Sequence, residues 1–280
     1  MSPIHDQGYR RYPGERSPHG RAWAVIAAAG LRGFFRRREF LGLLLVSLFP
    51  FFVRVVQIYA AANLPQAAFL RPSPEMFRDF LRQQDIFVFF IAVYVGSGLI
   101  ANDRRANALQ LYLSKPLTRA EYVFGKLAIL LAFLLLVTWV PATVLLLVQI
   151  VFAGNFTFVA DHLYLLPAIT LSSLVQALTV SVSMLALSSL SNSSRYVGIL
   201  FAGLVFFSQA LYGVLYAVTR DTSWSWMSFS ANVSQIMALI FRMPSPYATP
   251  WPVSLGVMVG VIAAAVLVLE RRVRGVEVVS

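Results

Sequence analysis

Ionisable side chains inside apolar stretches would be the chemical machinery of this sequence, because a charge at depth in a bilayer is costly and is kept only where it works. The sequence has 12 Asp and Glu residues and three His, and we expect all of them outside or at the edges of those stretches. No pair shows metal-ligand spacing, and cysteine is absent. The sequence therefore predicts no catalytic site, no metal and no bound cofactor.

Gly125 and Lys126 come closest to a nucleotide-binding loop. The earlier glycine that such a loop needs is replaced by Ala120, and Leu127 stands where Ser or Thr would be required. We therefore expect this chain not to bind ATP by that route.

Two polar features do lie within apolar stretches. Arg54 is about eight residues, or about 12 Å, from the end of its stretch. It either reaches the interface or pairs structurally, or it faces a substrate. Ser172, Gln176, Thr179 and Ser183 share one helical face. They either mediate helix packing or line a translocation pathway, and the pattern leaves both open.

The elements that must position these residues are apolar helices. Hydrophobic residues make up 58% of the chain and charged residues 12%, against roughly 25% charged in soluble domains. The sequence predicts an all-α membrane protein with six transmembrane helices in one domain, residues 40–270. The runs are 40–62, 86–101, 127–152, 163–190, 196–219 and 251–269.

The net charge of +11 suggests nucleic acid in a soluble protein, but its distribution indicates a membrane orientation. Segments 1–39, 102–126, 191–195 and 270–280 hold 17 Lys and Arg, and the opposite loops hold five. This bias places both termini in the cytoplasm and makes the lipid bilayer the partner, with no nucleic acid.

The segments outside the runs have distinct compositions. Residues 1–20 are expected to be a disordered cytoplasmic tail and 271–280 a second tail. Residues 21–39 predict a basic amphipathic helix on the inner membrane surface, or else a charged segment that only orients the first span. Ser73 is expected to cap a short helix that follows the first span. Residues 224–243 predict an outer helical segment, either partly buried or interfacial.

The cytoplasmic loop between the second and third runs is expected to be helical. Leu109, Tyr112 and Leu113 form one helical edge, and Pro116 ends that helix. Thr118 begins the next helix, with an acid three residues later as in a capping box. Two short helices at an angle therefore result.

At these residues the sequence resembles the permease subunits of ABC-type transporters in the type-2, exporter-like superfamily. There an acid, a Leu-rich turn, a Ser-x-Pro-x-x-Arg element and a Gly-Lys pair typically join the second and third spans. Here these are Asp103, residues 109–113, residues 114–119 and residues 125–126. The Gly-Thr pair common after the acid is replaced by residues 107–108, Asn-Ala, which marks a departure from the pattern.

The resemblance implies a bacterial cytoplasmic membrane protein that exports an apolar or amphipathic substrate. It implies a separate ATPase in two copies, which binds ATP and Mg²⁺, and a second permease copy, most simply in a homodimer. Loop 102–126 would be the coupling helix seated on the ATPase. The residues expected at that interface are Asp103, Arg104, Leu109, Leu111, Tyr112, Leu113, Ser114, Lys115, Pro116, Arg119, Glu121, Tyr122 and Lys126.

Two other classes of protein are weighed against this interpretation. A channel or secondary carrier that is not driven by ATP would be expected to keep a buried acid for ion coupling, and the sequence shows none within its apolar runs. An intramembrane enzyme would need a catalytic constellation at depth, which the sequence also lacks.

Overall fold

The computed structural model describes residues 22–108 and 118–273, and every regular element in that part of the chain is helical. The predicted tail 1–20 and all but the first residues of the tail 271–280 lie outside the described residues. The elements are α1 (Ala22–Phe35), α2 (Arg38–Ser47), α3 (Phe49–Asn63), η1 (Pro65–Leu70), α4 (Pro74–Gln83), α5 (Asp85–Ile91), η2 (Ala92–Gly96), α6 (Gly98–Arg105), α8 (Arg119–Val137), α9 (Trp139–Ala153), α10 (Thr157–Asp161), α11 (Leu165–Leu190), α12 (Ser194–Ala202), η3 (Gly203–Phe207), α13 (Ser208–Thr219), η4 (Thr222–Met227), α14 (Phe229–Ile240) and α15 (Trp251–Arg272).

The prediction of six membrane-crossing helices is confirmed for the described residues. These helices, some built from several elements in line, are Arg38–Asn63, Pro74–Arg105, Arg119–Ala153, Leu165–Leu190, Ser194–Thr219 and Trp251–Arg272. The second begins 12 residues earlier than predicted, because α4 continues into α5 and adds its own apolar stripe of Met76, Phe77, Phe80 and Leu81. The third begins at Arg119, eight residues early.

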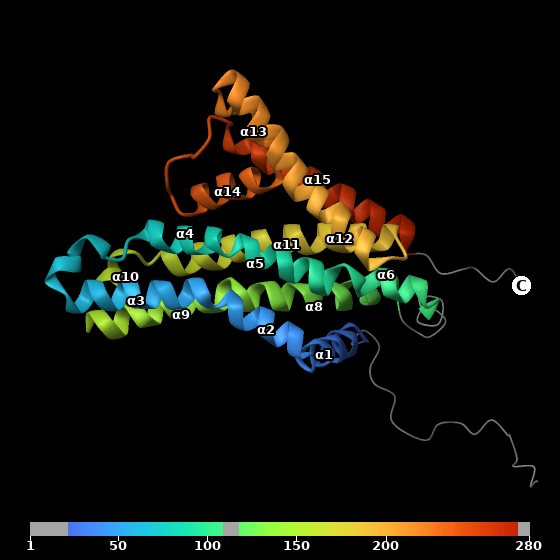
Figure 1. Ribbon diagram of the computed structural model, residues 1–280, viewed down its shortest axis with the longest axis horizontal. Helices are drawn as coiled ribbons and strands as arrows, with labels where there is room; N and C mark the ends of the chain where they lie inside the picture. Colours follow the sequence, from blue (N-terminus) through green and yellow to red (C-terminus); the bar gives the residue numbers. More distant parts are fainter. Residues whose placement is uncertain (1–21, 109–117, 274–280) are drawn as a thin grey trace, which may run out of the picture.

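α11 is the central helix of the bundle. It contacts α15, α8 and α6 most extensively, and 61% of its most apolar window is buried within the chain. The corresponding window of Arg38–Asn63 is only 17% buried, so that helix turns most of its side chains outward. In Figure 1, α13 leans away from the rest of the molecule, whereas α12 packs on α11 and α6, and α14 lies between α13 and α4.

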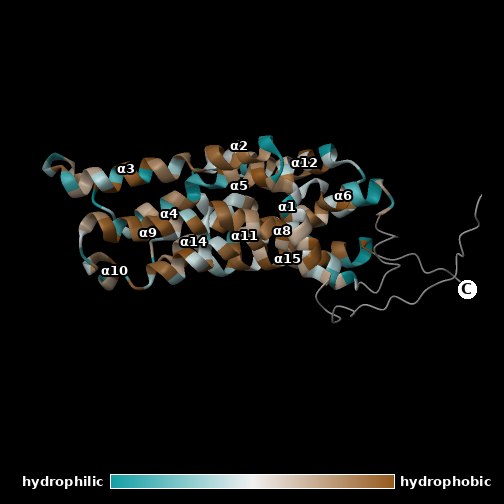
Figure 2. Ribbon diagram, turned by 90° about the horizontal axis from the view of Figure 1, so that it is seen from below, coloured by the Kyte–Doolittle hydropathy of each residue, from teal (hydrophilic) through white to brown (hydrophobic). Residues whose placement is uncertain are grey.

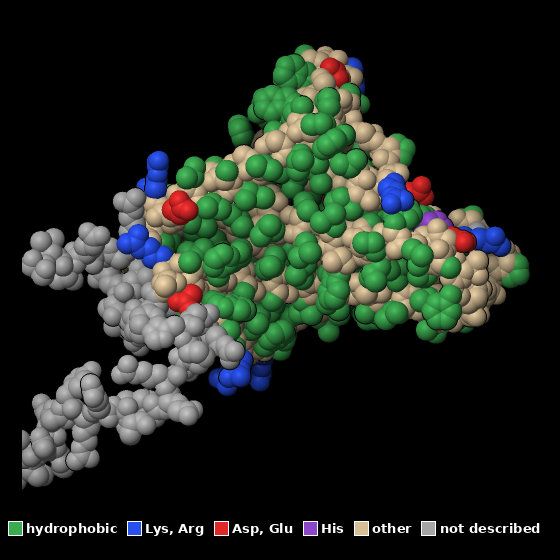
Figure 3. Space-filling view, turned by 180° about the vertical axis from the view of Figure 1, so that it is seen from behind, with side chains coloured by type: hydrophobic (Ala, Val, Ile, Leu, Met, Phe, Trp, Pro, Cys, Tyr) green, Lys and Arg blue, Asp and Glu red, His purple; other side chains and the backbone are tan. Residues whose placement is uncertain are grey.

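Apolar and charged side chains occupy different zones of the surface. The long helices are apolar along most of their middle (Figure 2). On the face shown in Figure 3, hydrophobic side chains cover the centre and charged side chains stand near the margins. α1 and the ends of α6 and α15 lie at one end of the molecule, with α10 at the other (Figure 1). A central apolar belt with charged ends suits a bilayer.

Two glycines let α1 lie directly against α8. A Cβ atom on Gly125 would come within 2.8 Å of the Ile26 Cβ and 3.0 Å of the Trp23 backbone oxygen. On the other helix, a Cβ on Gly30 would come within 2.2 Å of the Ile129 Cδ1. Small residues permit this close backbone approach. The apolar face predicted for residues 21–39 thus packs on the bundle, and its helix ends at Phe35.

Two spans are interrupted near their middle, each next to a proline. The first changes from α2 to α3 at Leu48, ahead of Pro50, and the third changes from α8 to α9 at Thr138, ahead of Pro141. Proline lacks the N–H that would continue the helical hydrogen-bond ladder. At the first break, Gln84 Nε2 donates to the Ser47 carbonyl oxygen (3.1 Å) from the second span. A neighbouring helix thus satisfies a backbone group there.

The predicted cap at Ser73 is wrong, although the helix does begin at Pro74. The Ser73 hydroxyl donates to the Glu75 carboxylate (2.8 Å) and makes no hydrogen bond to the helix backbone. The segment 224–243 forms η4 and α14, and α14 is buried on both its faces, including Asn232 and Gln235.

Candidate functional site

The base of the loop between α6 and α8 is held by three side chains. Asp103 Oδ2 accepts hydrogen bonds from Tyr122 Oη (2.7 Å) and from Lys126 Nζ (2.7 Å). The lysine ammonium also lies 5.4 Å from the centre of the Tyr122 ring. The side chains of Asp103 and Lys126 are only 19% and 12% exposed, so water screens this ion pair weakly. The ends of α6 and α8 are therefore tied together.

Further contacts fix the two helices on either side of the loop. Arg104 Nη1 donates to the Ser189 carbonyl oxygen at the end of α11. At the start of α8, the Thr118 hydroxyl accepts from the Glu121 backbone N–H (3.2 Å), and Glu121 Oε2 accepts from the Thr118 N–H (3.0 Å). The predicted capping box is thus confirmed. Arg119, next to it, is exposed.

The middle of the predicted ATPase interface lies outside the described residues. Of the expected interface residues, Leu109, Leu111, Tyr112, Leu113, Ser114, Lys115 and Pro116 lie outside the described residues. The structure brings together Asp103, Tyr122 and Lys126, and it directs Arg104 into the bundle.

The polar stripe predicted on the fourth span lies in the interior of the bundle. Ser172, Gln176, Thr179 and Ser183 of α11 are all at most 4% exposed. The Thr179 hydroxyl donates to the Val175 carbonyl of its own helix (2.8 Å), whereas the hydroxyls of Ser172 and Ser183 have no partner among the described residues. One residue of the stripe bonds to another helix: Gln176 Nε2 donates a hydrogen bond to Asp85 Oδ1 of α5 (2.5 Å).

Asp85 corrects the expectation that every acid lies outside or at the edges of the spans. It is the first residue of α5, but α4 runs straight into α5, so Asp85 lies inside the continuous span Pro74–Arg105. The sequence did not predict this position of Asp85, because the charged residues of α4 made the uncharged run begin only at Ile86. The one available signal was the regular apolar spacing of α4, which continues in phase toward Val88.

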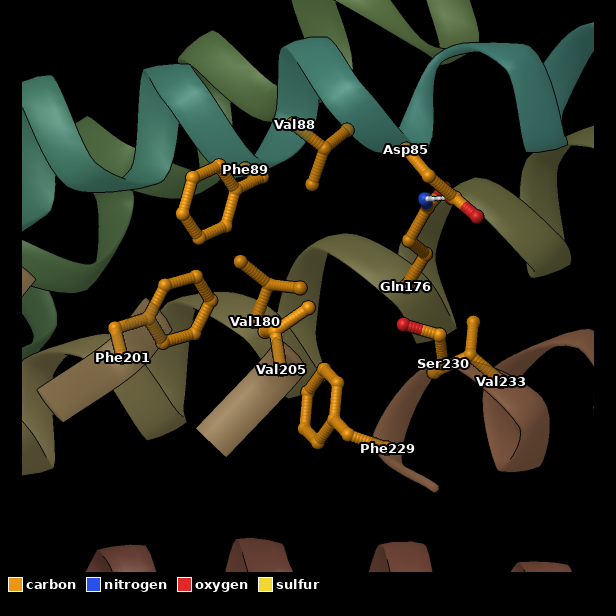
Figure 4. Close-up of a pocket in the computed structure, with 10 residues that line it drawn as sticks. All are labelled: Asp85, Val88, Phe89, Gln176, Val180, Phe201, Val205, Phe229, Ser230 and Val233. Carbon is orange, nitrogen blue, oxygen red and sulfur yellow. Dashed lines mark hydrogen bonds between the residues drawn. The ribbon is translucent and has the colours of Figure 1, made fainter. Parts of the chain in front are cut away.

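A small cavity adjoins the Asp85 carboxyl group. It has a volume of about 40 Å³ and lies between α5, α11, α12, η3 and α14. Figure 4 shows Asp85 and Gln176 close together on one side, Ser230 near them, and aromatic and valine side chains around the remainder. The lining residues are Asp85, Val88, Phe89, Gln176, Val180, Phe201, Val205, Phe229, Ser230 and Val233. The cavity is thus apolar except at that side.

A second cavity, of about 80 Å³, continues along the same stripe. Thr179 lines it together with Ser208, Asn232 and Phe229, and Phe229 also borders the first cavity. The π-helix η3 contributes Val205 to the first cavity and Leu204 to the second. Such π-helical turns are rare and frequently lie at functional sites. The interior between α11 and α14 is therefore the polar centre of the membrane domain.

Arg54 does not join this centre through its hydrogen bonds. Its Nη1 donates to Gln57 Oε1 (2.7 Å) on the same helix, and Gln57 Nε2 donates to the Leu70 carbonyl oxygen of η1 (3.4 Å). These contacts tie α3 to the turn that follows it. A role for Arg54 facing a substrate stays a prediction.

Comparison with known protein families gives one match that covers most of the chain. A family model described as ABC-2 family transporter protein matches residues 24–271. No curated protein matches the chain. The matched range includes all six spans, the loop between α6 and α8, and the cavities beside α11.

Proposed function

The chain belongs to the ABC-2 family of transporter proteins, and we propose on this basis that it is the membrane-spanning permease subunit of an ATP-driven transporter. A separate ATPase, in two copies, binds ATP with Mg²⁺ and hydrolyses it. Two copies of the chain form the membrane pathway, and the chain itself is not an enzyme. The observation that carries this proposal is the family match over residues 24–271.

Loop 102–126 is the surface that docks on the ATPase. Three features of its ends support this role: the Asp103–Lys126 ion pair, the Asp103–Tyr122 hydrogen bond and the capped start of α8. Because the loop is joined to α6 and α8 by these contacts, movement of the ATPase is passed to two spans at once. The middle of the loop supplies Tyr112 as an anchor.

The loop faces the cytoplasm in this proposal, as do both termini, in a bacterial cytoplasmic membrane. The support is charge: Arg36 and Arg37 stand between α1 and the first span, Arg38 begins that span, and Arg271 and Arg272 end the sixth. α1 and the ends of α6 and α15 also lie at one end of the molecule (Figure 1). Arginine-rich ends on the same side fit the positive-inside rule.

The cargo is apolar or amphipathic and is exported. The cavities beside α11 are lined mainly by Val, Phe and Met, and their polar lining residues are Asp85, Gln176, Thr179, Ser208, Ser230 and Asn232. An apolar wall with a few polar groups is typical of a small-molecule site, but cavities of about 40 and 80 Å³ hold water and not a cargo molecule, so the support lies in the chemistry of the wall and not in its volume. The stripe on α11 therefore contributes to the pathway.

A charge reversal in the loop tests the proposal. The tagged chain is purified from its native membranes, and ATP hydrolysis by the co-purified material is measured. We expect the wild type to retain an ATPase and Arg119→Glu to lose it while still inserting in the membrane. Arg220→Glu, the same change at an exposed residue of the opposite side, is the control and should retain the ATPase. A wild-type chain with no bound ATPase would contradict the proposal.

A second candidate function is favoured by Asp85. A carrier that is not driven by ATP would use a buried acid for ion coupling, and Asp85 lies inside a span. The first function requires ATP and the ATPase, and the second requires only an ion gradient. In vesicles that contain the permease with its ATPase, export that stops without ATP supports the first, and export by the permease alone along an ion gradient supports the second.

A further inference from the structure

The carboxyl group of Asp85 makes no ion pair among the described residues, although Arg82 attracts it electrostatically from a greater distance. Among the described residues, ion pairs within 4.0 Å join Arg78 to Asp79 and Lys126 to Asp103, and none involves Asp85. Arg82 precedes Asp85 by three residues, but its side chain is exposed. Asp85 is half-buried among helices of the membrane domain, and an ionised carboxylate there without a paired cation is disfavoured.

The surrounding helices bring no charge to the cavity either. α11, α14, α9 and η3 contain no Asp, Glu, Lys, Arg or His. Asp85 is the only titratable residue among those that line the cavity. The titratable groups on the other neighbouring elements are Glu75, Arg78, Asp79 and Arg82 on α4, Arg54 and Tyr59 on α3, Tyr94 on η2, Arg119, Glu121, Tyr122 and Lys126 on α8, and Arg195 and Tyr196 on α12.

The amide of Gln176 supplies the second observation. Gln176 is 3% exposed and lines the cavity, and its Oε1 has no hydrogen-bond partner among the described residues. A carboxylate only accepts hydrogen bonds, so an ionised Asp85 pairs with Nε2 and leaves Oε1 bare. A protonated Asp85 can donate from its second oxygen to Oε1 while it accepts from Nε2. Both atoms of the buried amide are then satisfied.

The argument does not depend on which way the amide is turned. With the amide reversed, Oε1 would face Asp85 Oδ1, and two oxygens at hydrogen-bond distance require a hydrogen between them. In both orientations the missing group is one O–H donor on Asp85.

We propose that Asp85 and Gln176 form a proton-binding site inside the membrane domain, with the proton held on the Asp85 carboxyl group. This goes beyond the proposed function and holds whether or not ATP drives transport. A metal ion fits poorly, because hard cations take six or more oxygen ligands, whereas Asp85, Gln176 and Ser230 supply the side-chain oxygens that line the cavity. About 40 Å³ admits water but no organic cation.

The site links proton binding to helix packing. A wider gap would admit more water than the closed cavity of about 40 Å³ holds; this water would solvate the ionised carboxylate, and the proton would leave the Asp85 oxygen for it. A movement of α5 away from α11 or α14 therefore releases the proton, and closure of the same gap takes it up. The ligand is a single proton, and the moving parts are the helices that border the cavity.

Infrared spectroscopy tests the proposal on the full-length chain in lipid vesicles at neutral pH, where exposed carboxyl groups are ionised. We expect the wild type to show the C=O band of one protonated carboxyl group. That band should be lost in Asp85→Asn, which keeps the size and the hydrogen bonds of the neutral acid. Asp79→Asn, at a side chain that is 43% exposed, is the control and should keep the band.

Gln176→Leu provides a second variant, because it removes the amide and leaves the acid. The band should persist there and shift to the frequency of a carboxyl group with fewer hydrogen bonds. A wild-type spectrum without the band would overturn the proposal, even if Asp85→Asn failed to fold. So would a wild-type melting temperature raised by Na⁺ or K⁺ but not by choline, with no such rise in Asp85→Asn. Because no ATPase is present, failure here leaves the proposed function untouched.

Discussion

At the scale of single residues, the Gly-Lys pair near the start of the third span has two separate physical tasks. Lys126 pairs with Asp103 across the loop, and Gly125 has no side chain because α1 lies against it. The two residues are adjacent in sequence, and they point to different partners. Each task can be removed without the other.

Removing the charge of Asp103 tests the first task. Asp103→Asn should lower the free energy of unfolding by about 1.5–3 kcal/mol, the range for hydrogen bonds to charged groups, because Lys126 would be left half-buried without its partner. The measurement is thermal unfolding of the purified chain in detergent. Asp79→Asn is the control, since its partner Arg78 is adjacent and the pair is more exposed. An equal loss in both variants would contradict the role of the ion pair.

A methyl group at Gly125 tests the second task. Gly125→Ala should destabilise the chain by about 1–3 kcal/mol, as overpacking does, because its Cβ would collide with Ile26 and the Trp23 backbone. Gly33→Ala is the matched control on α1, where a Cβ meets nothing within 4 Å. That change should be neutral or stabilising, since alanine is the better helix former. The measurement is the melting temperature of each variant relative to the wild type. An equal shift in Gly125→Ala and Gly33→Ala would argue against close packing of α1 on α8.

At the scale of elements, the sequence predicted the helices well and the ends of two spans poorly. An uncharged run in the sequence marks the part of a helix that can face lipid on all sides. One side of α4 packs against other helices, so its opposite side carries charged residues and the run does not include it. Its Arg78, Asp79 and Arg82 therefore made it look like a separate short helix between the first two spans, although Phe77 and Phe80 are fully buried. That error placed Asp85 at an edge.

The partners of the polar stripe could not be predicted for a related reason. Spacing along α11 puts Gln176 on one face with Thr179, but it does not say which helix lies opposite. Asp85 is 91 residues away in sequence. Only the three-dimensional packing brings the two side chains together.

The short element η4 provides a prediction on pH. Asp221 Oδ2 accepts from the Ser223 hydroxyl (2.5 Å) and Oδ1 from the Ser223 N–H (2.9 Å). These hydrogen bonds, the side-chain one first, hold the pKa of the Asp221 carboxyl below its usual value. The cap is therefore fully formed above the usual pKa of aspartate and is lost as pH falls through the lowered value.

Hydrogen exchange of residues 222–228 measures this effect. At each pH, the ratio of the wild-type exchange rate to that of Asp221→Asn cancels the intrinsic dependence of exchange on pH. Asn keeps an oxygen that accepts from Ser223 and does not titrate. The ratio should rise in acid, and a ratio that is flat with pH would show that the ionised carboxylate adds nothing to the cap.

At the scale of the whole molecule, charge and apolar surface define an axis. Lys and Arg gather toward the end of the molecule that holds α1 and the ends of α6 and α15, and the first, fifth and sixth spans bury only 17–22% of their most apolar windows. Those exposed apolar faces must meet lipid or another protein chain. The family match and the apolar belt agree on a membrane setting.

The orientation of this axis can be measured because the chain has no cysteine. Asn155 and Asn192 lie at exposed positions of connecting segments, and each can be replaced by a single cysteine. In intact cells, a thiol reagent that cannot cross the membrane should label Asn155→Cys and spare Asn192→Cys. In opened cells it should label both, which confirms access. Reversed labelling in intact cells would overturn the proposed orientation.

The ion pair between Asp103 and Lys126 connects the loop to the second span, which also carries Asp85. Asp103 and Asp85 stand on the same continuous helix, about 27 Å apart at 1.5 Å per residue. In the proposed transporter, a movement of the loop would reach Asp85 along this helix, and the π-helical turn η2 lies between the two residues. Spin labels at Glu75 and Asn102 would report whether ATP bends the helix at that turn or moves it as a whole.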